Sequence, residues 1–430
     1  MPLLMPHLLY VSPTDSVAPF SSINAALLRA VGGDTVLVGP GRYSPSQTQE
    51  HFPLYVPPGV TLMGAGQGES FIDGEGAMEL SLRPVQEGQS LILLGHRSTL
   101  TGFTLAKGGG NGIANQAGAS GLILRNEIRE HGQHGILLSG PQEVVIKDNI
   151  FLNNGTRRFA PTTPRGTHAR QGHHIFLQAR GGVANRVLIT DNTMTRAFAD
   201  ALALVVFFDE PEGISMQVSV INNLIEQSER RGLTITGSFS SSHVRAAIEV
   251  RRNVIRDNRE SGIAAQAARP LITTQIVDSH LRLDIHDNEY RNNGEGIALY
   301  GGFGPATDNL LDATLVGNLI TGTKSHGVRI IGGVGFGGHA AHRNRVRALI
   351  GRNRMEDIGE TPIFVQGGAA EGQEDVQDNE VLLHTVENEL HALPGKASIL
   401  INDGLAGNAV HLEDPAQPHE RVGGVIPYRV

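Results

Sequence analysis

Residues 250–263 read VRRNVIRDNRESGI, and residues 285–297 read IHDNEYRNNGEGI. Both segments place an apolar residue three positions before an asparagine, and both reach a Gly-Ile pair about nine residues later. The same frame recurs along the chain at Asn126, Asn149, Asn192, Asn223, Asn253, Asn288, Asn318 and Asn353, and less well at Asn388. The mean repeat of about 33 residues indicates a solenoid.

Each repeat has room for about three short strands and shows no helical spacing of its apolar residues, which argues against ankyrin and tetratricopeptide repeats. A β-propeller blade needs longer antiparallel strands and hairpin signals. The sequence therefore predicts an all-β chain whose repeats are the coils of a parallel β-helix. We expect the asparagines to form a ladder, because asparagine tolerates the left-handed backbone of a tight bend and its amides can stack along the axis.

Composition excludes several classes of protein. The 430 residues include 54 glycines and 21 prolines, no cysteine and no tryptophan, and the net charge is -8. This balance argues against a nucleic-acid partner, and the absence of a long apolar run argues against a membrane partner. The start of the chain does not read as a secretory signal, so a cytoplasmic protein and an exported one that has lost its signal both remain open.

The opening segment supports a family resemblance. Residues 22–28 read as a helix, and residues 33–43, GDTVLVGPGRY, read as a strand that closes on a Gly-x-Tyr turn. This segment and the asparagine repeats resemble the right-handed parallel β-helix proteins of the pectate-lyase-like superfamily. The resemblance implies about a dozen coils with an N-terminal capping helix over residues 22–31. It divides the chain into a cap helix and first strand (1–52), the β-helix (53–410) and a polar C-terminal tail (411–430).

Outward positions of the strand after each small residue form the face on which such proteins carry their sites. This face is neutral and partly apolar, with Phe176, Tyr300 and Arg329 among its outward residues. The resemblance implies that lyases acting on polyuronates carry aspartate clusters for calcium near this face. Such clusters are missing from the sequence, so we expect no metal and no cofactor.

The residue just before each small residue forms an ionisable column, with His173, Asp200 and Arg231 on consecutive coils. Stacked coils place such side chains about 5 Å apart, so the carboxylate could orient the imidazole for acid-base catalysis. A surface ladder of ion pairs is the alternative interpretation. The same column continues through Ser261, Glu295 and His326.

Further candidates lie in loops. An insertion over residues 155–172 carries Arg170 and three other arginines and is interpreted as a lid or as a subunit contact. The carboxylates Asp209 and Glu210, with His243 in the next coil, offer a second acid-base set. Phenylalanines recur in the loops after the strand. They either line a cleft or pack beneath the loops, and they are Phe207, Phe239, Phe303 and Phe336.

We therefore expect a carbohydrate-active β-helix enzyme, a lyase or glycosidase that acts on a neutral or weakly charged glycan at the outer strand face. The alternatives are an enzyme of the cyclase, isomerase or lyase type that encloses a hydrophobic small molecule under the phenylalanine-rich loops, and a non-catalytic binding solenoid. A homo-oligomer is compatible with each of these hypotheses.

Overall fold

The computed structural model describes residues 6–76, 90–155, 172–206, 213–239, 241–270, 275–370, 372, 374–405, 407–413 and 419–422. The chain divides into two compact units. Unit 1 comprises Met1–Gln178 and Val183–Leu202, and unit 2 comprises Ala179–Gly182 and Ala203–Val430. Nearly all regular structure is β-strand, and consecutive strands of each sheet pair in parallel.

Unit 1 contains three parallel sheets, A, B and C, which the chain visits in turn. Sheet A contains β1 (Leu8–Val11), β2 (Thr35–Val38), β5 (Thr61–Gly64), β8 (Ser98–Thr101), β11 (Gly121–Leu124), β14 (Glu143–Lys147) and β17 (Arg186–Thr190). Sheet B contains β3 (Gly41–Tyr43), β6 (Ser70–Asp73), β9 (Thr104–Ala106), β12 (Glu127–Arg129), β15 (Ile150–Leu152) and β18 (Thr193–Thr195). Sheet C contains β4 (Leu54–Val56), β7 (Ser90–Leu94), β10 (Asn111–Asn115), β13 (Ile136–Ser139) and β16 (Ile175–Ala179).

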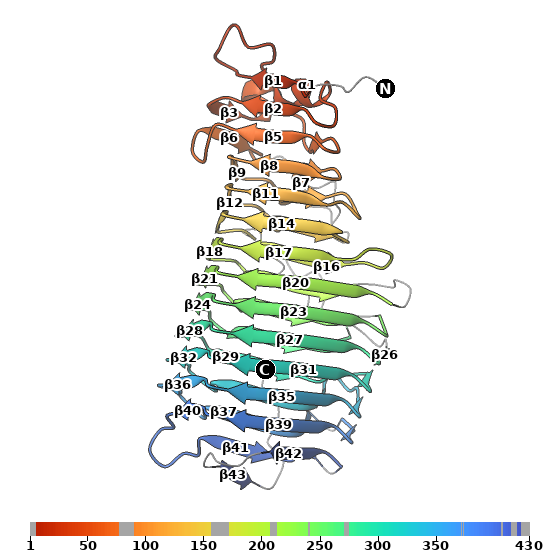
Figure 1. The fold of residues 1–430 in the computed structure, drawn as a ribbon, viewed down its shortest axis with the longest axis vertical. Helices are drawn as coiled ribbons and strands as arrows, with labels where there is room; N and C mark the ends of the chain where they lie inside the picture. Colours follow the sequence, from red (N-terminus) through yellow and green to blue (C-terminus); the bar gives the residue numbers. More distant parts are fainter. Residues whose placement is uncertain are drawn as a thin grey trace. The chain divides into compact units, whose positions relative to one another are not determined.

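Unit 2 repeats this plan, and its strands follow one another in order in Figure 1. Sheet A contains β20 (Ser215–Ile221), β23 (Arg245–Arg251), β27 (His280–His286), β31 (Leu310–Val316), β35 (Arg345–Gly351), β39 (Glu380–Val386) and β42 (Ala409–Glu413). Sheet B contains β21 (Leu224–Glu226), β24 (Val254–Arg256), β28 (Glu289–Arg291), β32 (Leu319–Thr321), β36 (Arg354–Glu356) and β40 (Glu389–Leu390). Sheet C contains β19 (Leu202–Val206), β22 (Leu233–Thr236), β25 (Ser261–Gln266), β29 (Glu295–Tyr300), β33 (Val328–Gly335), β37 (Ile363–Ala370), β41 (Ile399–Asn402) and β43 (His419–Val422).

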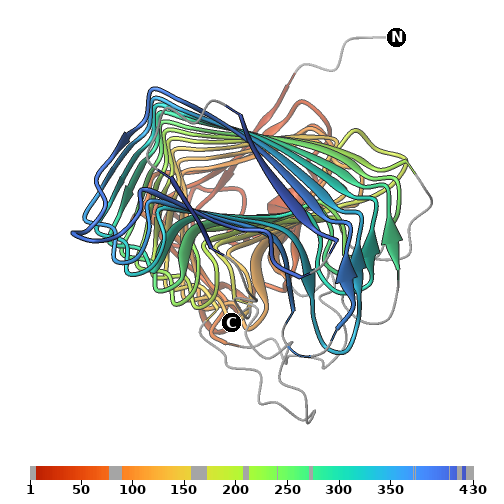
Figure 2. The ribbon, with the colours of Figure 1, turned by 90° about the horizontal axis from the view of Figure 1, so that it is seen from below.

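A fourth short sheet, D, occurs in unit 2 and was not predicted. It contains β26 (Ile276–Val277), β30 (Ala306–Thr307), β34 (Ala341–His342) and β38 (Val376–Gln377). Figure 2 shows the coils of unit 2 lying over one another when they are seen end-on. The predicted parallel β-helix is thus confirmed. Sheet B supplies six described strands in each unit, in agreement with about a dozen coils.

The interior of each coil is apolar because the strands alternate between inward and outward side chains. In β31, Leu311, Ala313 and Leu315 are buried and alternate with partly exposed residues. The register places Leu311 opposite Leu281 of β27 and Val346 of β35. Like side chains therefore stack from coil to coil.

Asparagine side chains connect successive coils at the bend between sheets A and B. The amide Nδ2 of Asn253 donates to the side-chain Oδ1 of Asn288 at 3.0 Å, and the backbone N–H of Asn253 donates to the same oxygen at 2.9 Å. Asn253 Nδ2 also donates to the Val220 carbonyl at 2.8 Å. The same pattern joins, within unit 2, Asn223, Asn253, Asn288, Asn318, Asn353 and Asn388, and, within unit 1, Asn126, Asn149 and Asn192.

One part of our expectation for this ladder was wrong. The left-handed backbone belongs to the residue before the asparagine: φ is +54° at Arg252 and +56° at Asp287. The asparagine itself points inward, and its amide bridges the bend by also donating to a carbonyl two residues earlier, which for Asn253 is the carbonyl of Arg251.

A second asparagine ladder, which we did not predict, accompanies sheet D. Asn309, Asn344, Asn379 and Asn408 are linked by the same amide-to-amide bonds of 2.9–3.0 Å. Each residue lies nine positions before a residue of the first ladder where that partner exists, as Asn344 does before Asn353. The bends at both ends of sheet A are therefore held by buried amides in these coils.

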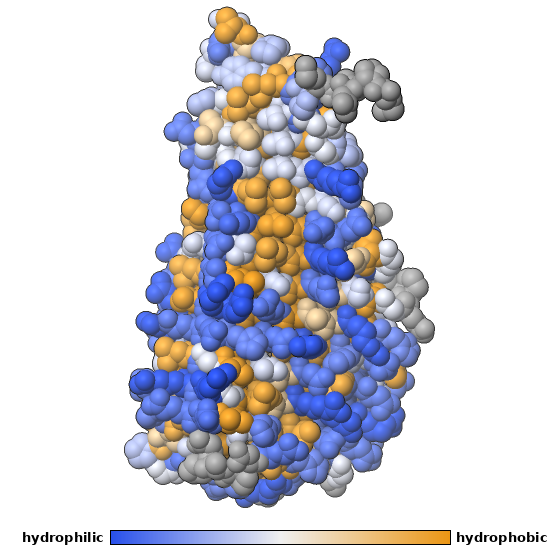
Figure 3. Space-filling model, viewed as in Figure 1, coloured by the Kyte–Doolittle hydropathy of each residue, from blue (hydrophilic) through white to orange (hydrophobic). Residues whose placement is uncertain are grey.

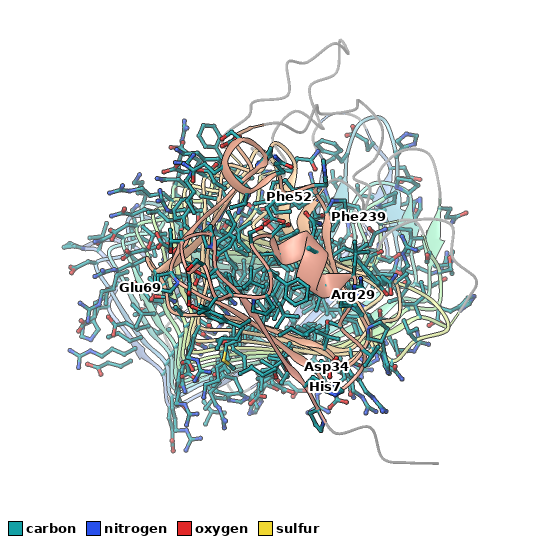
Figure 4. The ribbon with its side chains drawn as sticks, turned by 90° about the horizontal axis from the view of Figure 1, so that it is seen from above. His7, Arg29, Asp34, Phe52, Glu69 and Phe239 are labelled. Carbon is teal, nitrogen blue, oxygen red and sulfur yellow. The ribbon has the colours of Figure 1, made fainter. Side chains whose placement is uncertain are left out.

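The N-terminal region differs from the predicted cap helix over residues 22–31. Helix α1 (Ile23–Leu27) has only five residues, and α2 (Pro45–Thr48) has four. The buried Glu50 carboxylate accepts the backbone N–H groups of Ile23 and Asn24 at the start of α1. Helix α1 packs against β1, β2 and β4. Figure 4 shows this end of unit 1, where His7 binds Asp34.

Strand pairing also occurs within residues 1–52 and 411–430. Strand β1 precedes residue 53 and pairs with β2, while β43 lies in the region expected to be a polar tail and pairs with β41. Neither α1 nor α2, the helices of the described residues, has the length or hydropathy needed to cross a membrane.

The outer face of sheet A differs between the units. Figure 3 shows apolar side chains over the sheet A strands of unit 1, where Leu122 is 40% exposed. In unit 2 this face carries many charged side chains, which form ion pairs such as His280 with Asp312 and Arg345 with Glu380. Such exposed pairs contribute little stability individually.

We expect Asn253→Leu to lower the free energy of unfolding by about 2–4 kcal/mol, because the change removes the buried oxygen that accepts from the backbone and side-chain N–H groups of Asn223 and the amide that donates to the Val220 carbonyl. Chemical denaturation measures this loss. The control is Gln217→Leu, which replaces an exposed amide of β20. Equal stabilities of the two variants would contradict the structural role of the ladder.

Candidate functional site

The predicted His173 and Asp200 are neighbours in unit 1, where the imidazole contacts the backbone of Asp200. The Nδ1 atom of His173 lies 3.0 Å from the backbone carbonyl of Asp200. A carbonyl can only accept, so Nδ1 of His173 carries a proton. The hydrogen bond to this backbone carbonyl orients the imidazole, whereas the sequence suggested that the carboxylate would do so.

His173 belongs to a buried aromatic stack. Its ring stacks on His134 with centroids 5.3 Å apart, and the outward-facing Phe176 stacks on His134 at 4.8 Å. Burial lowers the pKa of His134 well below its usual value, and burial lowers the pKa of the adjacent His174 to about 3. Both imidazoles are therefore neutral near pH 7.

Two other predicted residues make surface ion pairs in unit 2. The guanidinium of Arg231 lies 3.1 Å from the carboxylate of Glu260. The exposed His243 has a left-handed backbone, with φ of +57°, and binds Asp278 at 3.0 Å. The hydrogen bond from His243, followed by those from Arg245, holds the pKa of Asp278 below its usual range. His243, Asp278 and Arg245 thus resemble a structural ion-pair cluster at a turn.

Four predicted residues lie outside the described residues: Asp209, Glu210, Arg170 and Phe207. The remaining loop aromatics lie in unit 2. Tyr300 and Phe303 are buried in one apolar cluster with ring centroids 4.7 Å apart, and Phe336 packs against that cluster. Phe239 is half-buried. The rings of Tyr300, Phe303 and Phe336 therefore pack beneath the loops, which is one of the two interpretations that the sequence left open.

A groove of about 650 Å³ lies on the outer face of sheet C in unit 2, over β33, β37, β41 and β43. Its floor carries outward side chains of successive strands, and its side is formed by the turns before them. The lining includes His326, Arg329, Glu360, Phe364, Lys396 and Glu420. Arg329 was predicted as a substrate-binding residue.

Arg329 is fixed by residues of the neighbouring strand β29. Its Nε and terminal NH2 atoms each lie 2.9 Å from one oxygen of the Glu295 carboxylate. The same NH2 group donates to the Tyr300 hydroxyl at 2.7 Å, and the Ser261 hydroxyl donates to Glu295 at 3.2 Å. One charge-assisted hydrogen bond and a second close ionic contact thus hold the guanidinium against the carboxylate.

Glu295 is almost fully buried, and burial raises the pKa of its carboxyl group above the usual value. The nearby positive charge of Arg329 opposes this rise, but burial is the larger effect. A buried carboxyl group beside a groove is a common feature of functional sites.

His326 and Glu360 form the second polar pair of the groove. The Nε2 atom of His326 lies 3.2 Å from the Glu360 carboxylate, and the imidazole stacks on Phe364 with centroids 4.8 Å apart. Burial lowers the pKa of His326 to about 4, although the charge of Glu360 opposes the shift. The imidazole is therefore neutral near pH 7 and can accept a proton.

The sequence pointed to part of this groove. Glu295 and His326 belong to the ionisable column that suggested His173, and Arg329 belongs to the predicted outward row. Glu360 and Lys396 were missed, although Glu360 directly precedes the column residue Thr361. A search of the positions flanking the column would have found Glu360.

The described residues contain one group with the spacing of metal ligands. Potential ligand atoms of Glu356, Glu389 and His391 lie within 4.8 Å of one another. Arg354 already pairs with both carboxylates, so a cation is supplied by the chain itself. The group lies outside the groove and has no evident part in its chemistry.

Comparison with known families gives one match. Residues 12–275 match the model of a family described as "Protein of unknown function (DUF1565)". No curated protein sequence matches the chain.

Solved structures share the fold at low sequence identity. An exopolygalacturonase of family 28 from Yersinia enterocolitica has a TM-score of 0.53 at 11% identity, over 96% of this chain and 79% of that chain. A polygalacturonase from Erwinia carotovora has a TM-score of 0.51 at 9% identity, over 95% and 97%. The surface adhesin PfbA of Streptococcus pneumoniae has a TM-score of 0.53 at 12% identity, over 90% and 94%. These similarities show the pectate-lyase-like parallel β-helix fold.

The raised pKa of Glu295 has a measurable effect on stability. Between its ordinary pKa and the raised one, the folded state holds a proton that the unfolded state has released, so this group's contribution falls as pH rises. We expect the difference in unfolding free energy between wild type and Glu295→Gln to decrease as pH rises above the ordinary glutamate pKa of 4.5. Denaturation at a series of pH values measures it. The exposed Glu229→Gln is the control, and a flat difference would contradict the shift.

Proposed function

The chain belongs to the DUF1565 family, and we propose that it is a carbohydrate-active enzyme that acts on a neutral or weakly charged glycan in the sheet C groove of unit 2. The observation that carries the proposal is the His326–Glu360 pair, which lines an open groove beside the fixed guanidinium of Arg329. The groove is lined by residues of four successive strands of sheet C, so an extended glycan can contact several coils. The fold is shared with polygalacturonases and with an adhesin, so fold alone does not decide between catalysis and binding.

In the proposed mechanism, His326 and Glu360 move the proton. A carboxylate can only accept, so the neutral imidazole donates its Nε2–H to Glu360 across the 3.2 Å contact, and the Glu360 carboxylate takes the proton from the reacting group. The pair then returns this proton to the leaving oxygen. In a glycosidase the proton comes from water, and in a lyase it comes from a ring carbon.

The other lining residues bind the glycan in this proposal. Arg329 donates hydrogen bonds to sugar oxygens from the floor, and Leu400 offers an apolar surface to a ring face. Lys396 and Glu420 carry opposite charges on the lining. This balance supports a ligand with little net charge.

We expect Glu360→Gln and His326→Asn each to lower the turnover rate about 100-fold or more with the fold intact, because a positioned acid-base group contributes that much. A panel of neutral and partly esterified polysaccharides provides the substrates. New reducing ends report a hydrolase, and ultraviolet absorbance of an unsaturated product reports a lyase. Glu389→Gln, which changes an exposed carboxylate outside the groove, is the control. Binding without turnover by the wild type would contradict the enzymatic proposal.

The pH dependence of this activity follows from His326. Because its pKa is about 4, the imidazole is neutral above that pH and charged below it. We expect the rate to persist at about pH 5 and to fall as pH drops through about 4. A pH profile of the rate measures this limb. A midpoint near the ordinary histidine value of about 6.5 would count against the neutral His326 as the partner of Glu360.

Calcium provides a further test of the substrate class. We expect neither added calcium nor a chelator to change the rate, since the groove lining among the described residues has no cluster of oxygen ligands of the calcium type. Calcium-dependent cleavage of polygalacturonate would contradict the proposed preference for weakly charged glycans.

A further inference from the structure

The floor of the groove has an unusual construction at Arg329. In the strand register Arg329 lies opposite Ala298 of β29, and Ala298 lies opposite Ala264 of β25. These small side chains leave space in which the guanidinium reaches back between Glu295 and Tyr300, at the two ends of β29. The guanidinium also lies over the Tyr300 ring, at 5.6 Å from its centroid.

Glu295 compensates the charge of Arg329 from beneath the floor. The two groups make a two-point contact of 2.9 Å and both are largely shielded from water, with the Glu295 side chain 6% exposed and that of Arg329 21% exposed. Charges interact strongly where water is excluded. A carboxylate on a ligand therefore meets a guanidinium whose charge is already offset, and it gains little net attraction. Sugar hydroxyls can still accept hydrogen bonds from it.

We propose that Glu295 is the specificity-determining residue of the groove, and that its buried carboxylate directs Arg329 to neutral sugars and away from acidic ones. This inference rests on the proposed function only in taking the groove as the glycan site. Glu295 acts through Arg329 and does not touch the ligand. Removal of the Glu295 carboxylate leaves the partly buried guanidinium of Arg329 without its counter-ion. An anionic group of the ligand then gains attraction to Arg329.

The test uses two probes of the same shape and different charge: α-1,4-linked trigalacturonate and its fully methyl-esterified form. Calorimetry at about pH 7 gives the dissociation constant of each probe, and the ratio of the two constants measures the preference for charge. We expect wild type to favour the ester or to bind both alike. In Glu295→Gln the ratio should shift towards the acid by about tenfold or more.

Three variants separate this role from a structural one. Glu295→Asp retains the negative charge and should keep most of the wild-type preference. The double variant Glu295→Gln/Arg329→Gln removes both charges and should lose the preference for the acid. Glu226→Gln breaks a comparable glutamate–arginine pair, with Arg256, on sheet B and should leave the ratio unchanged. If Glu295→Gln folds poorly, Glu295→Ser, which introduces the residue found at the aligned position of β25, should show the same shift towards the acid.

An unchanged ratio in Glu295→Gln overturns the proposal, and so does the absence of any gain for the acid, including absence of binding altogether. A wild type that prefers the acid also overturns it. The outcome is independent of catalysis: a charge switch without any turnover supports the role of Glu295 and contradicts only the enzymatic proposal.

Discussion

The hydrogen bond between one buried asparagine amide and the next is the interaction on which each unit depends. An amide donates along the axis and accepts from the preceding coil, so every ladder residue satisfies backbone groups that a tight bend would otherwise leave unpaired in the interior. The bend itself is made by the preceding residue, such as Arg252, whose left-handed backbone is independent of its side chain. The ladder therefore fixes the register, while the exterior of the turn can vary.

Register is also what brings the groove residues together. Arg329 can bind Glu295 only because β33 and β29 are aligned so that Ala298 lies opposite the arginine. A shift of one residue would turn Arg329 into the apolar interior and an interior isoleucine outwards. The charge arrangement of the groove thus depends on the packing of apolar side chains inside the coils.

The sequence predicted the repeating fold well and the candidate site only partly, for physical reasons. Residues such as Asn253 and Asn288 occupy buried positions that recur in every coil. Their regular spacing can therefore be recognised in the sequence. Strand alternation likewise predicted that Arg329 and Tyr300 point outwards. It could not show which outward residues remain exposed: Tyr300 is covered by Phe303, whereas Arg329 faces the groove.

The column that suggested His173 also contains Glu295 and His326, and nothing in its spacing distinguishes a residue beside an open groove from one in a buried stack. Sheet D was missed, and the helix expected over residues 22–31 is only the five-residue α1, because such short elements carry almost no periodic signal.

The two ladders of unit 2 restrict how the length of this chain can change. From Asn309 to Asn318, from Asn344 to Asn353 and from Asn379 to Asn388 the separation is always nine residues. An insertion or deletion of one residue within these nine would pull one asparagine out of line with its neighbours, since the other is held by its own ladder. Removal of an entire coil preserves the alignment of both ladders. Lengthening of a loop outside the nine-residue segments also preserves it. Length variation among related chains is therefore expected to occur in whole coils or in the loops outside the nine-residue segments, and the interval between the ladders should stay constant.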